Sequence, residues 1–373
     1  MKLQKETAVK ISKDVFISLF IYALPVIILA IYFNYNGEKP WLNNTHQPAK
    51  VNVPHFFNFI APIFRNLQSW GFLVITLALG IAEFGFGLYD NKWTASERKI
   101  DIACFLLPKF IGPPVSAFFT LKLLPLLLPG FKNEFTWVPF WGGVLLIAVA
   151  DDLTQYWYHR LHHQLPWLWR FHRTHHSAPY MGMAMASRQN YIYTLFFSQV
   201  YLTAALVYLG LGLPALMVGV IKHIITLSAH SSIAWDKPFY KYKILHPIAW
   251  VLERLISTPA THHAHHADST DDGVGYYKGN FGNMFFLWDV IFKTGIITRK
   301  YPSGYGIKHY KQEEWYAQFL WPIFKSKKEG SELAKKGPMV GDEIPVKKYD
   351  DLEEEDFIHP SSLAGAYYAT TNN

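Results

Sequence analysis

The sequence predicts an all-α integral membrane protein with about four to six transmembrane or re-entrant helices and a cytoplasmic helical cap that holds a histidine-rich di-metal site. Half of the 373 residues are hydrophobic and 17% are aromatic, which is more than an ordinary soluble domain carries. Several apolar segments approach the length that crosses a bilayer and contain few or no charges. Ten of the 17 histidines fall in two short windows.

Four candidate spans precede the first histidine window. Phe16–Phe33 carries no charge, and Gly71–Tyr89 is interrupted only by Glu83. The region Ile111–Ala150 predicts a hairpin of two further spans that turns around Gly130–Glu134. A cleaved signal peptide is the alternative for the first segment, but the Asn-Tyr-Asn-Gly that follows it offers no convincing small-residue cleavage site.

Basic residues set the expected orientation of these spans. They precede the first span and follow the second, so the positive-inside rule places both of those ends in the cytoplasm. The next hairpin then returns the chain to the cytoplasm at Asp151, where the histidine-rich part begins. The basic residues concerned are Lys2, Lys5, Lys10, Lys13, Lys92, Arg98 and Lys99.

A third apolar region, Tyr191–Leu227, has Gly210, Gly212 and Pro214 near its middle, which suits two short spans or a re-entrant hairpin. Beyond about Lys325 the chain becomes charged and poor in aromatic residues, which predicts a soluble or partly disordered cytoplasmic tail. Three parts are therefore expected: membrane spans over residues 1–135, a histidine-rich domain over 136–298 and the tail over 299–373.

The net charge and the single cysteine exclude some classes of protein. The formal charge is +7 and the pI is near 9.1, but the basic residues lie beside apolar segments and form no nucleic-acid motif, so a membrane surface explains them better. Cys104 is the only cysteine, so the chain forms neither an intrachain disulfide nor a thiolate metal cluster. Histidine or carboxylate must hold any metal.

The histidine windows contain three patterns that suit metal binding by helices. The first is H-x(3)-H, and residues four apart lie on one helical face. The second and third are H-x-x-H-H, in which three imidazoles at i, i+3 and i+4 converge. These histidines are His159 and His163, then His172, His175 and His176, and then His262, His265 and His266.

Eight histidines indicate two metals, because a catalytic zinc takes three protein ligands and a structural zinc takes four. Imidazole suits iron, zinc and copper alike. A pair of redox metals beside a bilayer is suited to activating oxygen against an unactivated lipid C–H bond, which side chains alone cannot attack. Asp152 shares a face with His159 and is expected to orient a ligand by accepting its hydrogen bond. His162 and His263 fall outside the minimal patterns and are set aside.

The three ordered patterns resemble the histidine boxes of the fatty acid hydroxylase/sterol desaturase superfamily, over about residues 137–295. Asn280-Phe-Gly and Trp288-Asp289-Val-Ile-Phe-Lys-Thr294 resemble its closing segment, with Lys293 in place of the usual glycine. The resemblance implies a membrane oxygenase that holds two iron ions and uses dioxygen to hydroxylate or desaturate a lipid, with residues 136–298 as its catalytic domain.

The same resemblance implies a ninth metal ligand. Members of the superfamily carry an isolated histidine after the membrane hairpin, and His230 in Ser228-Ala-His230-Ser is the best match. His223 is the competitor, but it lies seven residues earlier and deeper in the apolar stretch.

Short matches suggest a branch and a reductant. Ala186-Ser-Arg188-Gln-Asn190 and Thr258-Pro259 resemble the alkylglycerol monooxygenase branch, whose members use tetrahydrobiopterin. A separate electron-transfer protein is the alternative, because the sequence contains no second redox domain. Arg188 is a candidate for binding a cofactor or an anionic lipid head group, and a cytoplasmic anchor beside the following span is the alternative.

Two other functions compete with an oxygenase. A membrane zinc-handling protein, either a transporter or a sensor, would place its ligands along a path inside the spans, whereas nearly all of these histidines lie outside them. A structural zinc site would use fewer ligands. The HExxH pattern of zinc proteases is absent.

Overall fold

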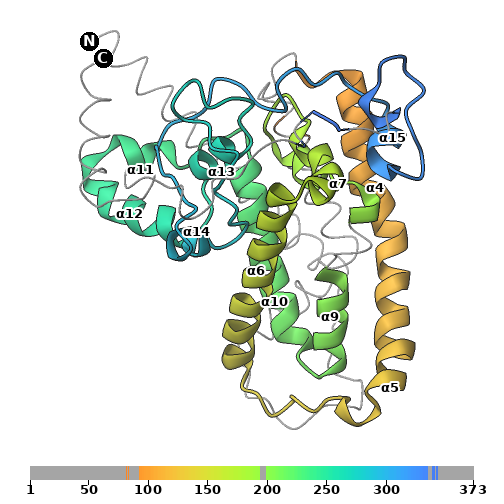
Figure 1. Cartoon of the computed structure of the whole chain (residues 1–373). Coiled ribbons are helices and arrows are strands. Elements are labelled where there is room, and N and C mark those ends of the chain that lie inside the picture. The colour runs from red at the N-terminus through yellow and green to blue at the C-terminus, as the bar shows by residue number, and fades with distance from the viewer. Residues whose placement is uncertain are drawn as a thin grey trace. The chain divides into compact units, whose positions relative to one another are not determined.

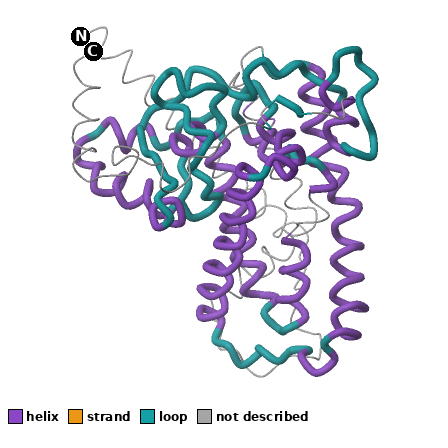
Figure 2. The backbone as a smooth tube through the Cα atoms, viewed as in Figure 1, coloured by secondary structure: helices purple, strands orange, loops and turns teal. Residues whose placement is uncertain are grey.

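The computed structural model describes residues 81, 83, 92–193, 199–334, 338–340 and 342. These residues form helices and loops without a β-strand (Figure 2), so the all-α prediction is confirmed for this part of the chain. The chain divides into two compact units. Among the described residues, unit 1 comprises 112–149 and 199–223, and unit 2 comprises 92–111, 150–193 and the residues from 224 onward.

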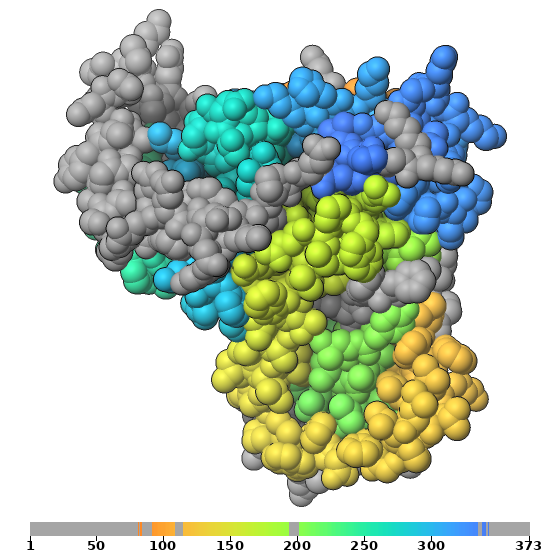
Figure 3. All heavy atoms as spheres, in the orientation of Figure 1, coloured from red at the N-terminus to blue at the C-terminus, as the bar shows by residue number. Residues whose placement is uncertain are grey.

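Unit 1 is built from two helical hairpins (Figure 1). The first hairpin joins the end of α4 to the beginning of α6, and the second joins α9 to α10. The elements that lie wholly or partly in unit 1 are α4 (Ala95–Phe118), the π-helix η2 (Phe119–Leu123), α5 (Leu124–Leu127), η3 (Pro129–Phe131), α6 (Phe140–Gln164), α9 (Gln199–Tyr208) and α10 (Gly212–His230). The space-filling view shows residues of α9, in green, between the yellow residues of α6 and the orange residues at the end of α4 (Figure 3).

The turns of the two hairpins bind each other. The backbone N–H of Asn133 donates to the Tyr208 carbonyl over 3.0 Å, and that of Phe135 donates to the Leu209 carbonyl over 2.9 Å. Gly210 ends α9 with a φ of 95°, and a Cβ there would lie 2.6 Å from the Cγ2 of Thr136. The left-handed φ and the close approach both require glycine.

The described residues contain one helix, α10, that is long and apolar enough to cross a bilayer, and a shorter apolar stretch at Val115–Leu127. The predicted span Phe16–Phe33 lies outside the described residues, as does Gly71–Tyr89 apart from two residues. α6 is apolar only as far as Ala150, because two aspartates follow.

The surface of unit 1 is rich in large apolar side chains. Seven of them are 57–76% exposed, whereas a soluble surface rarely gathers large apolar side chains into extended patches. They come from α4, η2, α5, α6 and the connection before α6. The residues are Phe118, Leu121, Leu126, Leu127, Trp137, Leu145 and Leu146.

Unit 2 joins short helices by long loops. Proline stands in the first turn of several of these helices. It is tolerated there because the N–H that proline lacks would have no acceptor within the helix at that position. The helices are α7 (Pro166–His176), α11 (Lys237–Lys241), α12 (His246–Leu255), α13 (Pro259–His265), α14 (Leu287–Ile291) and α15 (Trp315–Leu320), with single turns at η4 (Met183–Ser187), η5 (Lys243–Leu245) and η6 (Glu332–Ala334).

Candidate metal centre

The nine histidines expected as ligands gather in two buried groups in unit 2. Within each group the potential ligand atoms all lie within 4.8 Å of one another. None of the nine residues is more than 4% exposed. The five-histidine group is His159, His163, His172, His176 and His265, and the four-histidine group is His175, His230, His262 and His266.

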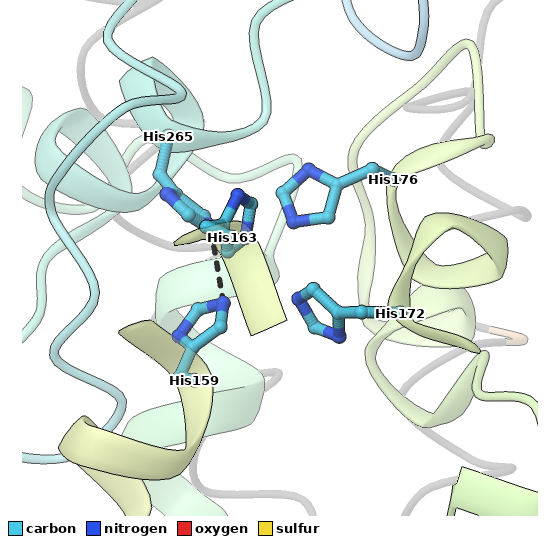
Figure 4. Close-up of side chains that lie close together, drawn as sticks. All are labelled: His159, His163, His172, His176 and His265. Carbon is cyan, nitrogen blue, oxygen red and sulfur yellow. Dashed lines mark hydrogen bonds between the residues drawn. The ribbon is translucent and has the colours of Figure 1, made fainter. Parts of the chain in front are cut away.

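The expectation that the three imidazoles of each H-x-x-H-H pattern converge on one point is wrong, because helical spacing divides each triplet between the two groups. His172 and His176 lie one turn apart on α7 and join the five-histidine group, whereas His175 points to the other group. His262 and His265 of α13 divide in the same way. Figure 4 shows the five rings of the first group, from α6, α7 and α13, facing a shared space.

The two groups are adjacent. Between the groups, the rings of His176 and His266 are stacked with centroids 4.3 Å apart; within the four-histidine group, the centroids of His175 and His266 lie 4.6 Å apart. Each of these pairs joins a ring of α7 to the end of α13. The packing of α7 on α13 therefore brings both groups into one site.

Backbone carbonyls determine the tautomer of four of the rings. The Nδ1 of His159 donates to the Phe281 carbonyl, and that of His265 donates to the Gly279 carbonyl, each over 2.7 Å. In the other group, His175 donates to the Arg188 carbonyl over 3.1 Å and His230 to the Thr226 carbonyl over 2.7 Å. A carbonyl can only accept, so Nδ1 carries the proton and Nε2 of each neutral ring has a lone pair.

These lone pairs face each other in pairs. The distances between the facing Nε2 atoms show whether a metal ion fits between them. The Nε2 atoms of His159 and His265 lie 3.1 Å apart, the contact drawn as a dashed line in Figure 4. Those of His175 and His230 lie 3.4 Å apart. No proton lies between two such atoms, so the contacts are repulsive without a cation. Two imidazoles bound at a right angle to one metal, at about 2.1 Å each, stand about 3 Å apart.

Other ring nitrogens in the two groups are buried without a hydrogen-bond partner among the described residues. Buried polar atoms are normally bonded, and an ion is one of the explanations for an exception. The atoms are both ring nitrogens of His163 and of His172, Nε2 of His176, Nδ1 of His262 and Nε2 of His266. The donor set therefore fits metal ions in both groups.

Burial keeps these imidazoles neutral. It lowers the pKa of His172, His175 and His176 well below the ordinary value of 6.5, and neighbouring imidazoles lower that pKa further. Burial also lowers the pKa of His262 and His266 well below that value. The neutral ring is the form that binds a metal.

Residues 279–282, which we call the carbonyl loop, position two ligands of the five-histidine group. Asp289 accepts hydrogen bonds from the backbone N–H groups of Phe281 and Gly282 over 2.9 and 2.5 Å. Asn280 has a φ of 57°, and its side chain donates to the Thr261 carbonyl and accepts from the Ile296 N–H. The loop is thus fixed with its carbonyls toward the histidine rings.

Asp152 supports the segment that follows the carbonyl loop. Its carboxylate accepts hydrogen bonds from the backbone N–H groups of Met284 and Phe285, over 3.2 and 2.8 Å, and from the Trp288 indole over 3.0 Å. These bonds join α6, which carries His159, to the beginning of α14. The sequence predicted a hydrogen bond from a ligand to Asp152, whereas these three bonds come from this segment, through which Asp152 would support the ligands.

Arg188 lies in a buried network of charges. Its guanidinium pairs with Glu97 and with Asp101, and it donates to the Thr174 carbonyl and to Ser177. Arg188 is 0% exposed. Burial lowers the pKa of the guanidinium, but the two carboxylates outweigh this effect and raise it above the ordinary value, so Arg188 stays charged.

The histidines set aside in the sequence lie outside both groups of the described residues. Nδ1 of His162 donates to the Tyr158 carbonyl over 2.7 Å. Nε2 of His263 donates to the Ser231 carbonyl and its Nδ1 accepts from the Tyr305 hydroxyl. The sequence missed the roles of Asn280 and Asp289, although both stand in the closing segment that carried the family resemblance.

A cavity of about 490 Å³ opens on α6 and the beginning of α7. His162 lines it, and the centroid of this ring lies 6.0 Å from that of His172 in the five-histidine group. Apolar and aromatic side chains make up most of the lining, which suits an apolar ligand. The lining residues are Leu153, Thr154, Trp157, Tyr158, Leu161, His162 and Leu168.

Comparison with known proteins identifies one family. Residues 144–294 match the family model described as fatty acid hydroxylase. The match includes all nine histidines of the two groups and the carbonyl loop. No curated protein and no solved structure matches the chain.

Proposed function

We propose that this chain, whose residues 144–294 match the fatty acid hydroxylase family model, is a membrane-bound di-iron oxygenase of the fatty acid hydroxylase/sterol desaturase superfamily that hydroxylates or desaturates a lipid. The observation that carries the proposal is the division of nine buried histidines into two adjacent groups inside the family domain. A single metal would use far fewer imidazoles.

The histidine groups would hold one metal each. With two iron ions bound, the site would gain the capacity to reduce dioxygen and break an unactivated C–H bond, which side chains lack. Imidazole ligands also suit zinc and copper, and the family assignment favours iron. The protein contributes neutral rings, carbonyls that fix the Nε2 atoms toward the metals, and burial that excludes water from the site.

The overall reaction accounts for the electrons that the protein must receive. In hydroxylation, one oxygen atom enters the C–H bond and the other leaves as water, so two electrons and two protons are consumed. In desaturation, two hydrogen atoms leave the lipid and both oxygen atoms become water, with the same two electrons from outside. We propose tetrahydrobiopterin or a separate electron-transfer protein as the reductant. The matches at Ala186–Asn190 and Thr258–Pro259 support the alkylglycerol monooxygenase-like branch and its pterin.

The proposed substrate is a lipid because the available space beside the site is apolar. The cavity lined by α6 reaches His162, one ring away from His172. Leucine, tryptophan and tyrosine side chains would hold a hydrocarbon chain by removing it from water. This arrangement would orient one part of the chain toward the five-histidine group.

The proposed location is a membrane, with several spans and the histidine groups on the cytoplasmic side. The apolar helix α10 and the exposed apolar side chains of unit 1 support the membrane. The distribution of basic residues supports the orientation. The domain boundaries that accompany this topology are residues 1–135, 136–298 and 299–373.

A zinc-handling transporter or sensor is the competing function. Such a protein would place its ligands along a path inside its spans. Here His230 is the last residue of α10, and the other eight ligands belong to the end of α6, to α7 and to the third box on α13 and its C-cap. The ligand set therefore favours a closed metal centre over a path.

Metal analysis and lipid analysis together test the proposal. The protein is purified anaerobically, and we expect about two iron atoms per chain because each group supplies enough ligands for one. Cells that express the wild type under isotopically labelled dioxygen should contain lipids with one labelled oxygen atom or with two hydrogen atoms fewer. The His175→Ala variant should lose iron and abolish the lipid change.

The matched control is His309→Gln, because His309 is exposed and lies outside both groups. This variant should retain the iron and the lipid products of the wild type. One zinc atom per chain, together with lipids that do not change in the His175→Ala variant, would reject the oxygenase function.

A further inference from the structure

An exposed apolar stripe runs along α12 in unit 2. Ile248, Val251 and Leu255 follow one another at intervals of three and four residues and therefore lie on one face of α12, and Ile244 of the preceding turn η5 continues the spacing. Ile244 is 86% exposed, Ile248 48%, Val251 50% and Leu255 42%. α12 is therefore an amphipathic helix whose apolar face is not covered by the described part of the chain.

The stripe continues onto neighbouring side chains. Ile291 of α14 is 53% exposed and Trp250 is 45% exposed, and α14 packs beside α12 (Figure 1). The guanidinium of Arg254 lies 4.4 Å from the centroid of the Trp250 ring. We define the α12 surface as Ile244, Ile248, Trp250, Val251, Leu255 and Ile291.

The opposite face of α12 is fixed to the rest of unit 2. Ala249 is 1% exposed and Glu253 is 0% exposed. The Glu253 carboxylate accepts two hydrogen bonds from Arg299, over 2.9 and 2.7 Å, and one from Arg254 over 2.9 Å. Rotating α12 to hide its apolar face would break these buried pairs, so the stripe is held outward.

The charge around the stripe is positive. Lys237, Lys241 and Lys243 are exposed. The only acidic residues between positions 236 and 256 are Asp236 and Glu253, and both are buried. An apolar surface with cations at its edge and a tryptophan among its members has the composition of a helix that lies in the interface of an anionic membrane.

We propose that the α12 surface lies in the head-group region of a bilayer that contains anionic lipids. The apolar stripe contacts acyl chains, and Lys241 and Lys243 contact lipid phosphates or carboxylates. A second copy of the chain is a poorer partner, because a self-complementary contact would bring the same cations together.

This contact goes beyond the oxygenase function, because it assigns a second membrane contact outside the spans. α12 is also linked to the candidate metal centre. Ser257, two residues after the end of α12, donates to the Gly282 carbonyl over 2.5 Å, and its N–H donates to the Met284 carbonyl over 3.0 Å. The next residue, Thr258, caps α13, which carries His262 and His265.

A fluorescent label at Ile248 tests the contact in the full-length protein. Cys104 is buried, and burial raises the pKa of its thiol to about 12, so a thiol-reactive dye should modify only a cysteine introduced at the surface. The Ile248→Cys variant, labelled with an environment-sensitive dye, is reconstituted into nanodiscs of phosphatidylcholine and phosphatidylserine. Phosphatidylcholine that carries a nitroxide near its head group should reduce the emission about twofold or more.

The matched control is Thr270→Cys, because Thr270 is an exposed residue of the same unit. Its label should keep a solvent-like spectrum and should not respond to the nitroxide lipid. Adding Lys241→Glu and Lys243→Glu to the Ile248→Cys variant should weaken the quenching about twofold in membranes with phosphatidylserine and much less in pure phosphatidylcholine. Unfolding temperatures equal to that of the wild type would establish that these variants are folded.

A solvent-like label at Ile248→Cys that the nitroxide lipid does not quench would overturn the proposal. A label that is protected but unquenched, together with disulfide cross-linking between two copies at position 248, would assign the surface to self-association instead. Neither outcome depends on oxygenase activity, so the membrane contact and the proposed function are tested separately.

Discussion

Hydrogen bonds at Nδ1 decide which nitrogen of an imidazole is available at the candidate metal centre. His159, His175, His230 and His265 each donate from Nδ1 to a backbone carbonyl. The four acceptors come from the carbonyl loop, from residue 188 and from α10 itself. The ligand geometry is thus fixed by the backbone before a metal binds, which lowers the conformational entropy that binding must overcome.

Arg188 links one of these carbonyls to a buried charge network. Its carbonyl accepts from His175, while its side chain pairs with Glu97 and Asp101. Trp93 donates to the Asp101 carboxylate over 2.9 Å. Burial raises the pKa of Asp101 to about 6, against the opposite effect of Arg188. From these contacts we propose that Arg188 is a structural residue that positions His175.

Replacing Arg188 by methionine should destabilise the protein by about 3–5 kcal/mol, because the change leaves two buried carboxylates without their cation. Arg188→Lys should be milder, since a lysine keeps the charge but cannot reproduce the bonds to Thr174 and Ser177. Thermal unfolding of the purified variants measures both effects. Adding Glu97→Gln to Arg188→Met should recover part of the loss.

Kinetics with the reductant separate this role from cofactor binding. A guanidinium that binds the reductant would make Arg188→Lys raise the KM for that reductant while leaving the unfolding temperature unchanged. If Arg188 instead positions His175, the substitution should lower both the unfolding temperature and the iron occupancy. Unchanged stability in Arg188→Met would contradict the network as the reason for the burial of Arg188.

The sequence indicated the candidate ligands better than it indicated the groups that hold those ligands in place. Histidines at i, i+3 and i+4 must share a region of space when they lie on helices, so the eight box residues follow from spacing, and His230 followed from the resemblance. Arg188 could not be assigned, because a basic residue before an apolar segment has the same pattern at a membrane surface and in a buried ion pair. The sequence could not indicate which backbone carbonyls accept hydrogen bonds from the histidines, because every residue has a carbonyl group.

At the scale of elements, the carbonyl loop is the part that depends most on tight packing. A Cβ at Gly279 would lie 2.1 Å from the Tyr276 ring and 2.3 Å from the Thr294 carbonyl. A Cβ at Gly282 would lie 2.5 Å from the Phe285 carbonyl. The loop can approach its neighbours this closely only because both residues lack a side chain.

Gly279→Ala should therefore move the Gly279 carbonyl away from His265. Loss of such a supporting hydrogen bond typically lowers metal affinity about 10- to 100-fold, and we expect iron to be lost first from the five-histidine group. Competition with a chelator, followed by iron analysis, measures the affinity. Gly219→Ala on α10 is the control, because a Cβ there would meet nothing within 4 Å.

Equal resistance of Gly279→Ala and the wild type to the chelator would contradict the role of the loop. A general loss of folding would be detected as a change in the helical signal, which Gly279→Ala should preserve because residue 279 lies in a loop. The second glycine provides an independent check, since Gly282→Ala should weaken the acceptor of His159 through its neighbour Phe281.

The elements differ in how far the sequence predicted them. The apolar region Tyr191–Leu227 was expected to turn near Gly210, and a glycine with a φ of 95° does end α9 there. The resemblance placed a glycine where this chain has Lys293, and Lys293 adopts a φ of 54°, a conformation that favours glycine. The five-residue helices α11 and α14 had no periodic signal, because five residues contain fewer than two turns.

At the scale of the whole molecule, the two units bury different kinds of side chain. In unit 1 the apolar residues Ile147, Leu211, Ala215 and Val218 form a core, and many apolar side chains remain exposed. Unit 2 buries imidazoles, carboxylates and guanidinium groups, each of which must be paired to offset its desolvation. The sequence predicted the apolar segments from composition, but it could not predict charge pairs such as Glu97–Arg188 and Arg170–Asp342, whose members lie more than 80 positions apart.

Metal removal should consequently destabilise unit 2 more than unit 1. Without cations, the facing Nε2 atoms of His159 and His265 repel each other, and each metal held at about 1,000 times its dissociation constant would have added about 4 kcal/mol of stability. Hydrogen exchange measured before and after chelation should show lost protection in residues 155–176 and 259–282.

Peptides from α5 and α9 serve as the internal control, because they carry none of the nine histidines, and their exchange should change little. Uniform loss of protection in both units would indicate that the metals stabilise the chain as a whole. No loss at all would mean that the histidine groups are stable without metal and that the facing Nε2 atoms do not destabilise the metal-free protein.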